Sequence, residues 1–332
     1  MPSPEAAHLN FGYRSIVIRP STEEDHAAIA DIANALYPDR PPRTIEGYRA
    51  AIRSQPPEAS AQTFAAEVSG LVVGHLWLNR LIYVSNPHSW YMELEVHPAA
   101  QSRGVGSGMF EFALDRLLEH HAGWVRAYVR EDQPVARAFA AHRGFRETGL
   151  ADRPSRLEVR SANTELSQRA AERLRQEGIR IATLEELGET EDVLRRAHAL
   201  VNETEADMPA WEERSPMPYE EWQRVRVEEG ERPDMVWVAL DGGRVVGVAP
   251  LVPRPGRSAF NRWTGVARSH RGRGIARALK HHQIEWARQQ GVEYLFTEND
   301  VSNAPMLRIN TDFGYWPLPA SLEVVKELVG DG

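Results

Sequence analysis

The sequence predicts an α/β protein built from two copies of one module, each with a mixed sheet. Three observations lead to this prediction. Residues 101–106, QSRGVG, recur as residues 271–276, RGRGIA, an offset of 271 − 101 = 170. Phe139, Gly144 and Phe145 recur as Ile309, Gly314 and Tyr315 at the same offset. Within each copy, short β-rich runs alternate with runs that have helical spacing of apolar residues.

The elements of the first copy follow in order along the chain. A strand is expected at 15–19, and Ser21 or Thr22 is placed to cap the helix that follows. Residues 64–68 and 71–78 form a predicted hairpin with a Ser-Gly turn. A strand at 91–96 leads into the glycine segment and a long helix. A strand at 124–129 and a helix at 135–143, ended by Gly144, complete this copy.

The second copy repeats this order. A strand is expected at 179–181, a helix from Thr183, and a hairpin at 236–240 and 245–248. The hairpins are 173 residues apart, since Gly70 matches Gly243, so a surface loop differs by three residues. Residues 163–177 are polar with helical spacing and predict a linker helix that packs on one domain. We expect domains at 1–160 and 179–332, joined by a linker at 161–178.

Composition limits the function. The chain of 332 residues has a formal net charge of −8, which disfavours nucleic acid and anionic membranes as partners and mildly favours a cationic substrate such as an amine. A solvated acidic surface without a partner is the commoner explanation. The absence of cysteine excludes disulfides, thiolate metal sites and a cysteine nucleophile, and it fits the cytoplasm, where we expect the protein. No signal peptide or membrane-spanning run is expected.

The repeated glycine segment has the form of a phosphate site. A strand that feeds a glycine turn and then a helix leaves several backbone N–H groups unpaired at the positive end of the helix dipole. A pyrophosphate fits there. By itself such a segment is more often an ordinary turn. No Lys-Ser or Lys-Thr follows, so it is not a P-loop, and its place in the middle of each copy argues against a Rossmann site.

Each copy contains a glycine loop and, at a fixed distance after it, a segment that ends in Gly-Phe or Gly-Tyr. Together these segments resemble the GNAT superfamily of acyl-CoA-dependent N-acetyltransferases. The family loop, Gln/Arg-x-x-Gly-x-Gly/Ala, is matched by both glycine segments. The later family segment, Asn-x-x-Ala and then Gly-Phe, is matched by Asn303, Met306, Gly314 and Tyr315, and by Gln133, Ala136, Gly144 and Phe145. The second copy looks most like tandem bacterial members, a group that includes mycothiol synthase. The resemblance implies two domains, each a mixed, mostly antiparallel twisted sheet flanked by helices.

The resemblance also implies an acetyl-CoA site in each copy and direct attack of an amine on the thioester. The pantetheine would pair with the edge of the fourth strand near Val96 or Val266, and the pyrophosphate would lie on the glycine loop. Asn303 would line the second cleft. The implied acetyl-CoA contacts are Val96, Gln101, Ser102, Arg103, Gly104, Val105, Gly106 and Ser107 in the first copy, and Val266, Arg271, Gly272, Arg273, Gly274, Ile275, Ala276 and Asn303 in the second.

Candidates for the catalytic base differ between the copies. Glu93 and Glu95 share one face of the fourth strand in the first copy, and Glu298 follows the fifth strand in the second. A solvated strand face, or a helix cap at Asp300 or Ser302, explains these residues equally simply. The tyrosine that often protonates the CoA thiolate in the family is replaced by Ala140 and Asn310, which puts turnover in both copies in doubt.

The sequence therefore predicts an enzyme that moves an acetyl group from acetyl-CoA to a primary amine of a small molecule. We expect the second copy to be the catalytic one, because Thr297, Asn299 and Asn303 keep the polar character of the family's cleft; Glu93 and Glu95 argue for the first. The alternative is a regulatory or structural protein that binds acyl-CoA without turnover. No metal site is expected, because the adjacent His281 and His282 point to different helix faces. The protein is expected to be a monomer or homodimer.

Overall fold

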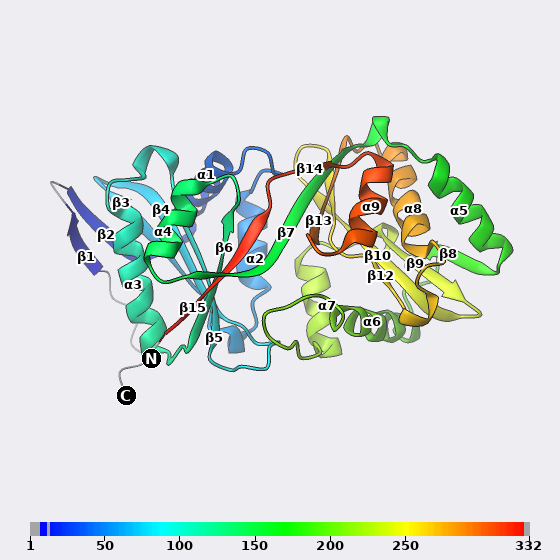
Figure 1. Ribbon diagram of the computed structural model, residues 1–332, viewed down its shortest axis with the longest axis horizontal. Coiled ribbons are helices and arrows are strands. Elements are labelled where there is room, and N and C mark those ends of the chain that lie inside the picture. The colour runs from blue at the N-terminus through cyan, green and yellow to red at the C-terminus, as the bar shows by residue number, and fades with distance from the viewer. Residues whose placement is uncertain (1–6, 12–13, 329–332) are drawn as a thin grey trace. The chain divides into compact units, whose positions relative to one another are not determined.

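The computed structural model describes residues 7–11 and 14–328 (Figure 1). Two compact units divide the chain, and the first is discontinuous: it contains Met1–Gly149 together with Ser321–Gly332, whereas the second contains Leu150–Ala320. This division differs from the expected domains at 1–160 and 179–332: the first unit breaks off at Gly149 and resumes at Ser321, and the expected linker at 161–178 lies within the second unit. The chain's last strand belongs to the first unit, and most of the strand that follows the first copy belongs to the second.

The first unit has a sheet with helices on both faces (Figure 1). Neighbouring strands are antiparallel, except that β5 and β6 are parallel. Helices α1 and α2 pack on one face through Ile29, Tyr48 and Trp77. Helices α3 and α4 pack on the other face, where Phe110 meets Phe139. The strand order is β1 (Ala7–Phe11), β2 (Arg14–Pro20), β3 (Gln62–Val68), β4 (Leu71–Arg80), β5 (Ser89–Val96), β6 (Trp124–Arg130) and β15 (Ser321–Glu327); the helices are α1 (His26–Leu36), α2 (Ile45–Arg53), α3 (Val105–Glu119) and α4 (Pro134–His142).

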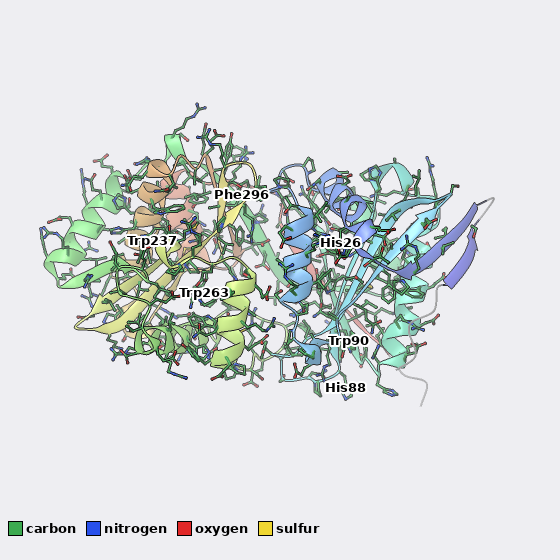
Figure 2. The ribbon with its side chains drawn as sticks, turned by 180° about the vertical axis from the view of Figure 1, so that it is seen from behind. His26, His88, Trp90, Trp237, Trp263 and Phe296 are labelled. Atoms are coloured by element: carbon green, nitrogen blue, oxygen red, sulfur yellow. The ribbon has the colours of Figure 1, made fainter. Side chains whose placement is uncertain are left out.

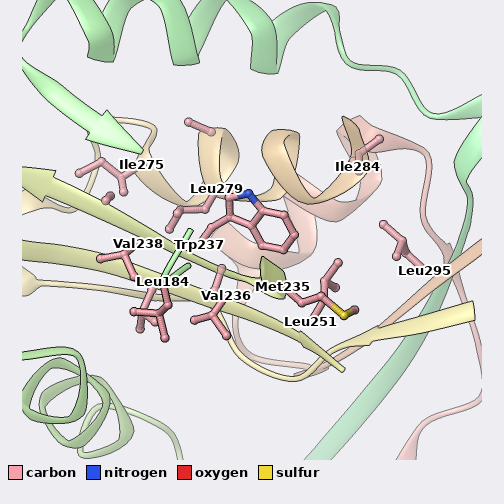
Figure 3. Packing of buried hydrophobic residues seen from close by; sticks show 14 of the residues in the cluster. Leu184, Met235, Val236, Trp237, Val238, Leu251, Ile275, Leu279, Ile284 and Leu295 are labelled. Carbon is pink, nitrogen blue, oxygen red and sulfur yellow. The ribbon is translucent and has the colours of Figure 1, made fainter. Parts of the chain in front are cut away.

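The second unit repeats this plan. Trp237 of β9 lies in its core together with Leu279 and Ile275 of α8 (Figure 3). The predicted linker helix is α5, and it packs against α8. The strand order is β7 (Arg146–Glu158), β13 (Tyr294–Asp300), β11 (Ser258–Asn261), β10 (Arg244–Arg254), β9 (Val236–Asp241) and β8 (Ile179–Thr183), with β12 (Gly265–Val266) on β10 and β14 (Trp316–Pro317) on β7; the helices are α5 (Glu165–Gln176), α6 (Glu191–Glu205), α7 (Tyr219–Glu228), α8 (Ile275–Gln289) and α9 (Ala304–Phe313).

The last strands of the two copies are exchanged. Strand β15 ends the second copy, yet it pairs with β6 of the first unit from Ser321 to Glu327. Strand β7 ends the first copy, yet its residues Asp152–Glu158 pair with β13 of the second unit. Both pairings are antiparallel, so each sheet receives an equivalent strand. Because the two strands offer the same hydrogen-bonding edge, sequence order alone does not decide which sheet takes which strand.

Candidate functional site

In each unit two parallel strands run together and then part. Strand β5 pairs with β6 from Ser89 to Tyr91, and from Met92 to Val96 it is paired with β4 alone. In the second unit, β11 pairs with β13 up to Asn261, and the chain then crosses to β12, which pairs with β10. Trp263 lies in this interruption (Figure 2). Beyond each parting, the strand that leads to the glycine loop is no longer paired with its parallel neighbour.

The second unit has one additional residue at this point. The pairs Leu78–Met92 and Leu251–Asn261 are equivalent, and so are the pairs Gly74–Val96 and Gly247–Val266. Three residues separate Met92 from Val96, whereas four separate Asn261 from Val266. The extra residue acts as a bulge that divides the fourth strand into β11 and β12.

The two glycine loops have the same local structure. The side chain of Gln101 donates a hydrogen bond to the carbonyl of Val96 (3.0 Å), and Arg271 donates to the carbonyl of Val266 (3.1 Å). Gly104 and Gly274 cap the following helices with φ of 86° and 90°, which favours glycine. The first helical N–H groups with a backbone acceptor in these turns are those of Gly108 and Ala278. The preceding N–H groups point out of the helix start, as a bound phosphate requires.

Apart from Asn303, the predicted acetyl-CoA residues therefore lie in two places, one around the start of α3 and one around the start of α8. The loop residues Ser102, Arg103 and Gly272 are exposed, while Val105 and Ile275 anchor their loops in the core. Sequence reasoning missed Arg173 of α5, which donates a hydrogen bond to the carbonyl of Arg273 (2.7 Å). It places a further guanidinium beside the second loop.

Asn303 has a structural role that the resemblance did not indicate. Its side chain accepts a hydrogen bond from the N–H of Met306 (3.2 Å), so Asn303 caps α9. The alternative caps Asp300 and Ser302 do not hold this position; Asp300 accepts from the N–H of Ser302 in the turn before the helix. Glu298 lies within β13 and does not follow that strand as expected, because pairing with β7 continues the strand to Asp300. It is half-buried, opposite Pro154 of β7 and one residue beyond the last pair of β13 with β11.

Glu93 and Glu95 lie on one face of β5, as predicted, and they share one cation. Arg43, from the segment between α1 and α2, donates hydrogen bonds to Glu93 Oε1 and Glu95 Oε2, both at 3.1 Å. Glu95 is 2% exposed. Burial opposes ionisation of Glu93, but the Arg43 charge outweighs it and holds the pKa of that carboxyl below its usual value. The Glu93 carboxylate is thereby kept available as an acceptor.

A buried histidine connects this pair to α2. His75 Nδ1 lies 3.5 Å from Glu95 Oε2 and 3.8 Å from Glu93 Oε1, and its Nε2 lies 2.8 Å from the hydroxyl of Tyr48. Carboxylate oxygens only accept, so the contacts favour the tautomer with the proton on Nδ1 and with Tyr48 donating to Nε2. Arg43, Tyr48 and His75 come from three separate segments, and no sequence motif had marked them.

A cavity of about 350 Å³ opens beside this network. Glu93 lies at one side and the aromatic rings of Tyr48, Trp77 and Tyr91 form much of the wall. Helix α2 contributes Gly47 and Ala51 to its lining, and Gln55 from just beyond the helix also lines it. A second hollow of about 800 Å³ lies between α5 and β8 and is lined by His281 and His282, but by none of the predicted site residues.

The types and spacing of His75, Glu93 and Glu95 also suit a metal ion, because their ligand atoms lie within 4.8 Å of one another. The sequence analysis did not foresee this group. Arg43 already supplies a cation to both carboxylates, so the observed contacts are those of an ion-pair network.

The comparisons with known proteins decide the family. The model of the acetyltransferase (GNAT) family matches residues 17–145 and again 197–315. The chain belongs to the GNAT family. It is therefore an acyltransferase with two GNAT domains, as the paired loops predicted. No curated protein sequence matches it.

Solved structures of other tandem or GCN5-related proteins have the same fold over nearly the whole GNAT chain. A tandem GNAT protein from the clavulanic acid biosynthesis pathway has a TM-score of 0.75 at 20% identity, covering 96% of this chain and all of that one. A GCN5-related N-acetyltransferase from Sphaerobacter thermophilus has a TM-score of 0.70 at 19% identity, covering 94% and 95%. At such identities the likeness concerns the fold. The narrower resemblance of the second copy to mycothiol synthase stays a prediction. In the described part of the chain, no helix is long and apolar enough to cross a membrane.

Proposed function

We propose that this GNAT protein is an acetyl-CoA-dependent N-acetyltransferase that acetylates a primary amine of a small molecule, and that the first unit holds the amine. One observation carries the proposal: a carboxylate pair lies where β5 leaves β6, beside an aromatic-walled cavity. The sequence had favoured the second copy. The geometry of Glu93 and Glu95 is the reason for choosing the first.

The charge of the network suits a monocationic amine. Two carboxylates and one guanidinium leave a net charge of about −1 in a largely buried region. An ammonium group in the cavity would complete the balance, and the rings of Trp77 and Tyr91 would favour it through cation–π attraction. The aromatic wall also favours an apolar body on the substrate. We therefore infer an amine with an apolar group and without a carboxylate.

The chain's own residues supply the remaining functions. Bound acetyl-CoA supplies an electrophilic acetyl carbon. The loops that begin α3 and α8 offer N–H groups to its pyrophosphate, and the edge of β5 beyond Tyr91 offers main-chain groups to its pantetheine. Glu93 lies in the cavity wall and is the group that takes a proton from the ammonium. Glu95 and His75 hold Glu93 and Arg43 in place from the buried side.

Release of CoA in the presence of a panel of amines tests this proposal. The panel contains arylalkyl and alkyl monoamines, diamines and amino acids, and we expect the first two classes to raise the rate most. Glu93→Gln should lower kcat by about 10²-fold or more while acetyl-CoA still binds. Ala51→Trp fills the cavity from an exposed position on α2 and should raise the KM of the amine without changing acetyl-CoA affinity.

A negative result has a definite meaning. If acetyl-CoA binds but no amine raises CoA release above background, the protein is a non-catalytic acyl-CoA-binding module. If turnover survives both variants but is lost with Glu298→Gln, the amine site lies in the second unit.

A further inference from the structure

A buried polar cluster lies at the strand parting of the second unit, where the first unit is apolar. It is formed by side chains from β11, β13, α8 and α9. At equivalent positions the first unit has Met92, Phe110, Ala113, Ala127 and Ala140, and the second has Asn261, Lys280, Gln283, Thr297 and Asn310. All five polar residues are at most 2% exposed. Because the two folds correspond here, the fold itself does not require polar groups at these positions.

Lys280 is the exceptional member of this cluster. Within residues 14–328 its side chain donates one hydrogen bond, to Asn261 Oδ1 at 3.4 Å, and its ammonium nitrogen lies 5.3 Å from the centroid of the Tyr315 ring. Among the described residues no carboxylate forms an ion pair with it. The carboxylates of Asp312 on α9 and Glu285 on α8 are already paired, with Arg277 and Arg288 respectively. Lys280 therefore lacks the anionic partner that a buried cation normally has.

Burial without an anion lowers the pKa of Lys280 to about 7. An arriving anion would reverse this effect, because a negative charge in contact favours the protonated amine. Asn310 is a second polar group of the cluster that is incompletely hydrogen-bonded, since its Oδ1 is buried without a hydrogen-bond partner in the described structure. Lys280 and Asn310 thus leave room in this cluster for the interactions of a bound ligand, above all for an anionic group beside Lys280.

The position of the cluster suggests the source of that group. Asn261 is the last residue of β11 paired with β13, and the glycine loop lies at the far end of the same segment, attached to Val266 by Arg271. A ligand anchored on the loop by its phosphates and running along this segment would end at Asn261 and Lys280. We propose that the second unit binds an acyl-CoA whose acyl chain ends in a carboxylate, and that Lys280 is the counter-ion of that carboxylate. The proposal rests on the proposed function for its CoA ester and extends it with a second donor class.

Calorimetric titration of the full-length protein tests the inference through proton uptake. Succinyl-CoA, acetyl-CoA, and CoA together with free succinate are titrated at pH 8 in two buffers of different ionisation enthalpy. Succinyl-CoA should bind with an uptake of about 0.5–1 proton more than acetyl-CoA, because Lys280 becomes protonated in the complex. Lys280→Met should abolish the excess uptake and weaken succinyl-CoA binding about tenfold or more, with acetyl-CoA affinity unchanged.

The chain offers a matched control, because Lys326 is its only other lysine and lies partly exposed in the first unit. Lys326→Met should change neither quantity. Thermal unfolding of each variant tests whether it is folded. We expect Lys280→Met to fold, because Phe110 at the equivalent position indicates that this site accepts an apolar side chain. Equal proton uptake for succinyl-CoA and acetyl-CoA, or unchanged binding in Lys280→Met, overturns the inference.

Two further outcomes separate the proposals. If free succinate with CoA reproduces the proton uptake, Lys280 binds a free carboxylate and the assignment to the acyl chain is wrong. If no CoA ester binds, both the proposed function and this inference fail. Acetyl-CoA binding without a response specific to succinyl-CoA leaves the proposed function standing and removes the inference alone.

Discussion

The exchange of β15 into the first unit predicts that mutations near the C-terminus destabilise the N-terminal part of the protein. Val324 and Val325 lie on opposite faces of β15 and are 3% and 1% exposed. Val324 belongs to the core formed with α3. Val→Ala at each position removes two buried methyl groups and leaves a cavity, at a cost of about 2 kcal/mol each.

The double variant Val324→Ala/Val325→Ala should therefore lose about 3–5 kcal/mol, a large part of the 5–15 kcal/mol that is typical of a domain. Hydrogen exchange followed by mass spectrometry locates the loss. Peptides from β3 should exchange faster in the variant, whereas peptides from β9 should keep their protection. Val227→Ala is the control, since Val227 is 74% exposed and the change should stay within about 0.5 kcal/mol. Loss of protection in β9 with β3 intact would refute the assignment of β15 to the first unit.

Two further predictions concern single side chains. Lys280→Met should stabilise the protein at neutral pH. The pKa of Lys280 in the folded protein is about 7, below the ordinary lysine value of 10.5, so between these pH values the unfolded chain binds more protons than the folded one. Lys280 therefore makes the free energy of unfolding of the wild type rise by about 1 kcal/mol from pH 7 to pH 8. Urea denaturation at both pH values measures this rise, which should be absent from the variant. Gln101→Leu removes the hydrogen bond that attaches the first loop to Val96 and should weaken acetyl-CoA binding at that site about tenfold, as measured by calorimetry. Unchanged affinity there would mean that the loop keeps its shape without this bond.

Sequence reasoning could reach features that depend on neighbours along the chain. The glycine loops, the hairpins and the helix after residue 163 are local, since a few adjacent residues fix their backbone conformation. The repeat offset then showed that two such segments belong to one fold. Glu93 and Glu95 were found because strand alternation places residues two apart on one face.

The rest of the candidate site depends on contacts between distant segments. Arg43, Tyr48 and His75 are ordinary residues in their own segments, and only packing of α2 and its preceding segment on β4 and β5 brings them to the carboxylate pair. The repeat offset of 170 aligns Lys280 with the apolar Phe110, so the sequence indicates a core position there, but it does not show which side chains surround the lysine. Its missing partner becomes evident only when every neighbouring side chain is placed.

The sequence by itself determined that this protein has two GNAT-like copies, each with a glycine loop of the form that suits a phosphate, because the glycine positions and the repeat offset can be read directly from the chain. Tertiary structure alone decided the exchange of β7 and β15, the ionic network around Arg43 and the isolation of Lys280. The physical reason is the same in each case. Strand partners, buried charges and cavities are set by which surfaces meet in three dimensions, and residues far apart in the chain supply those surfaces.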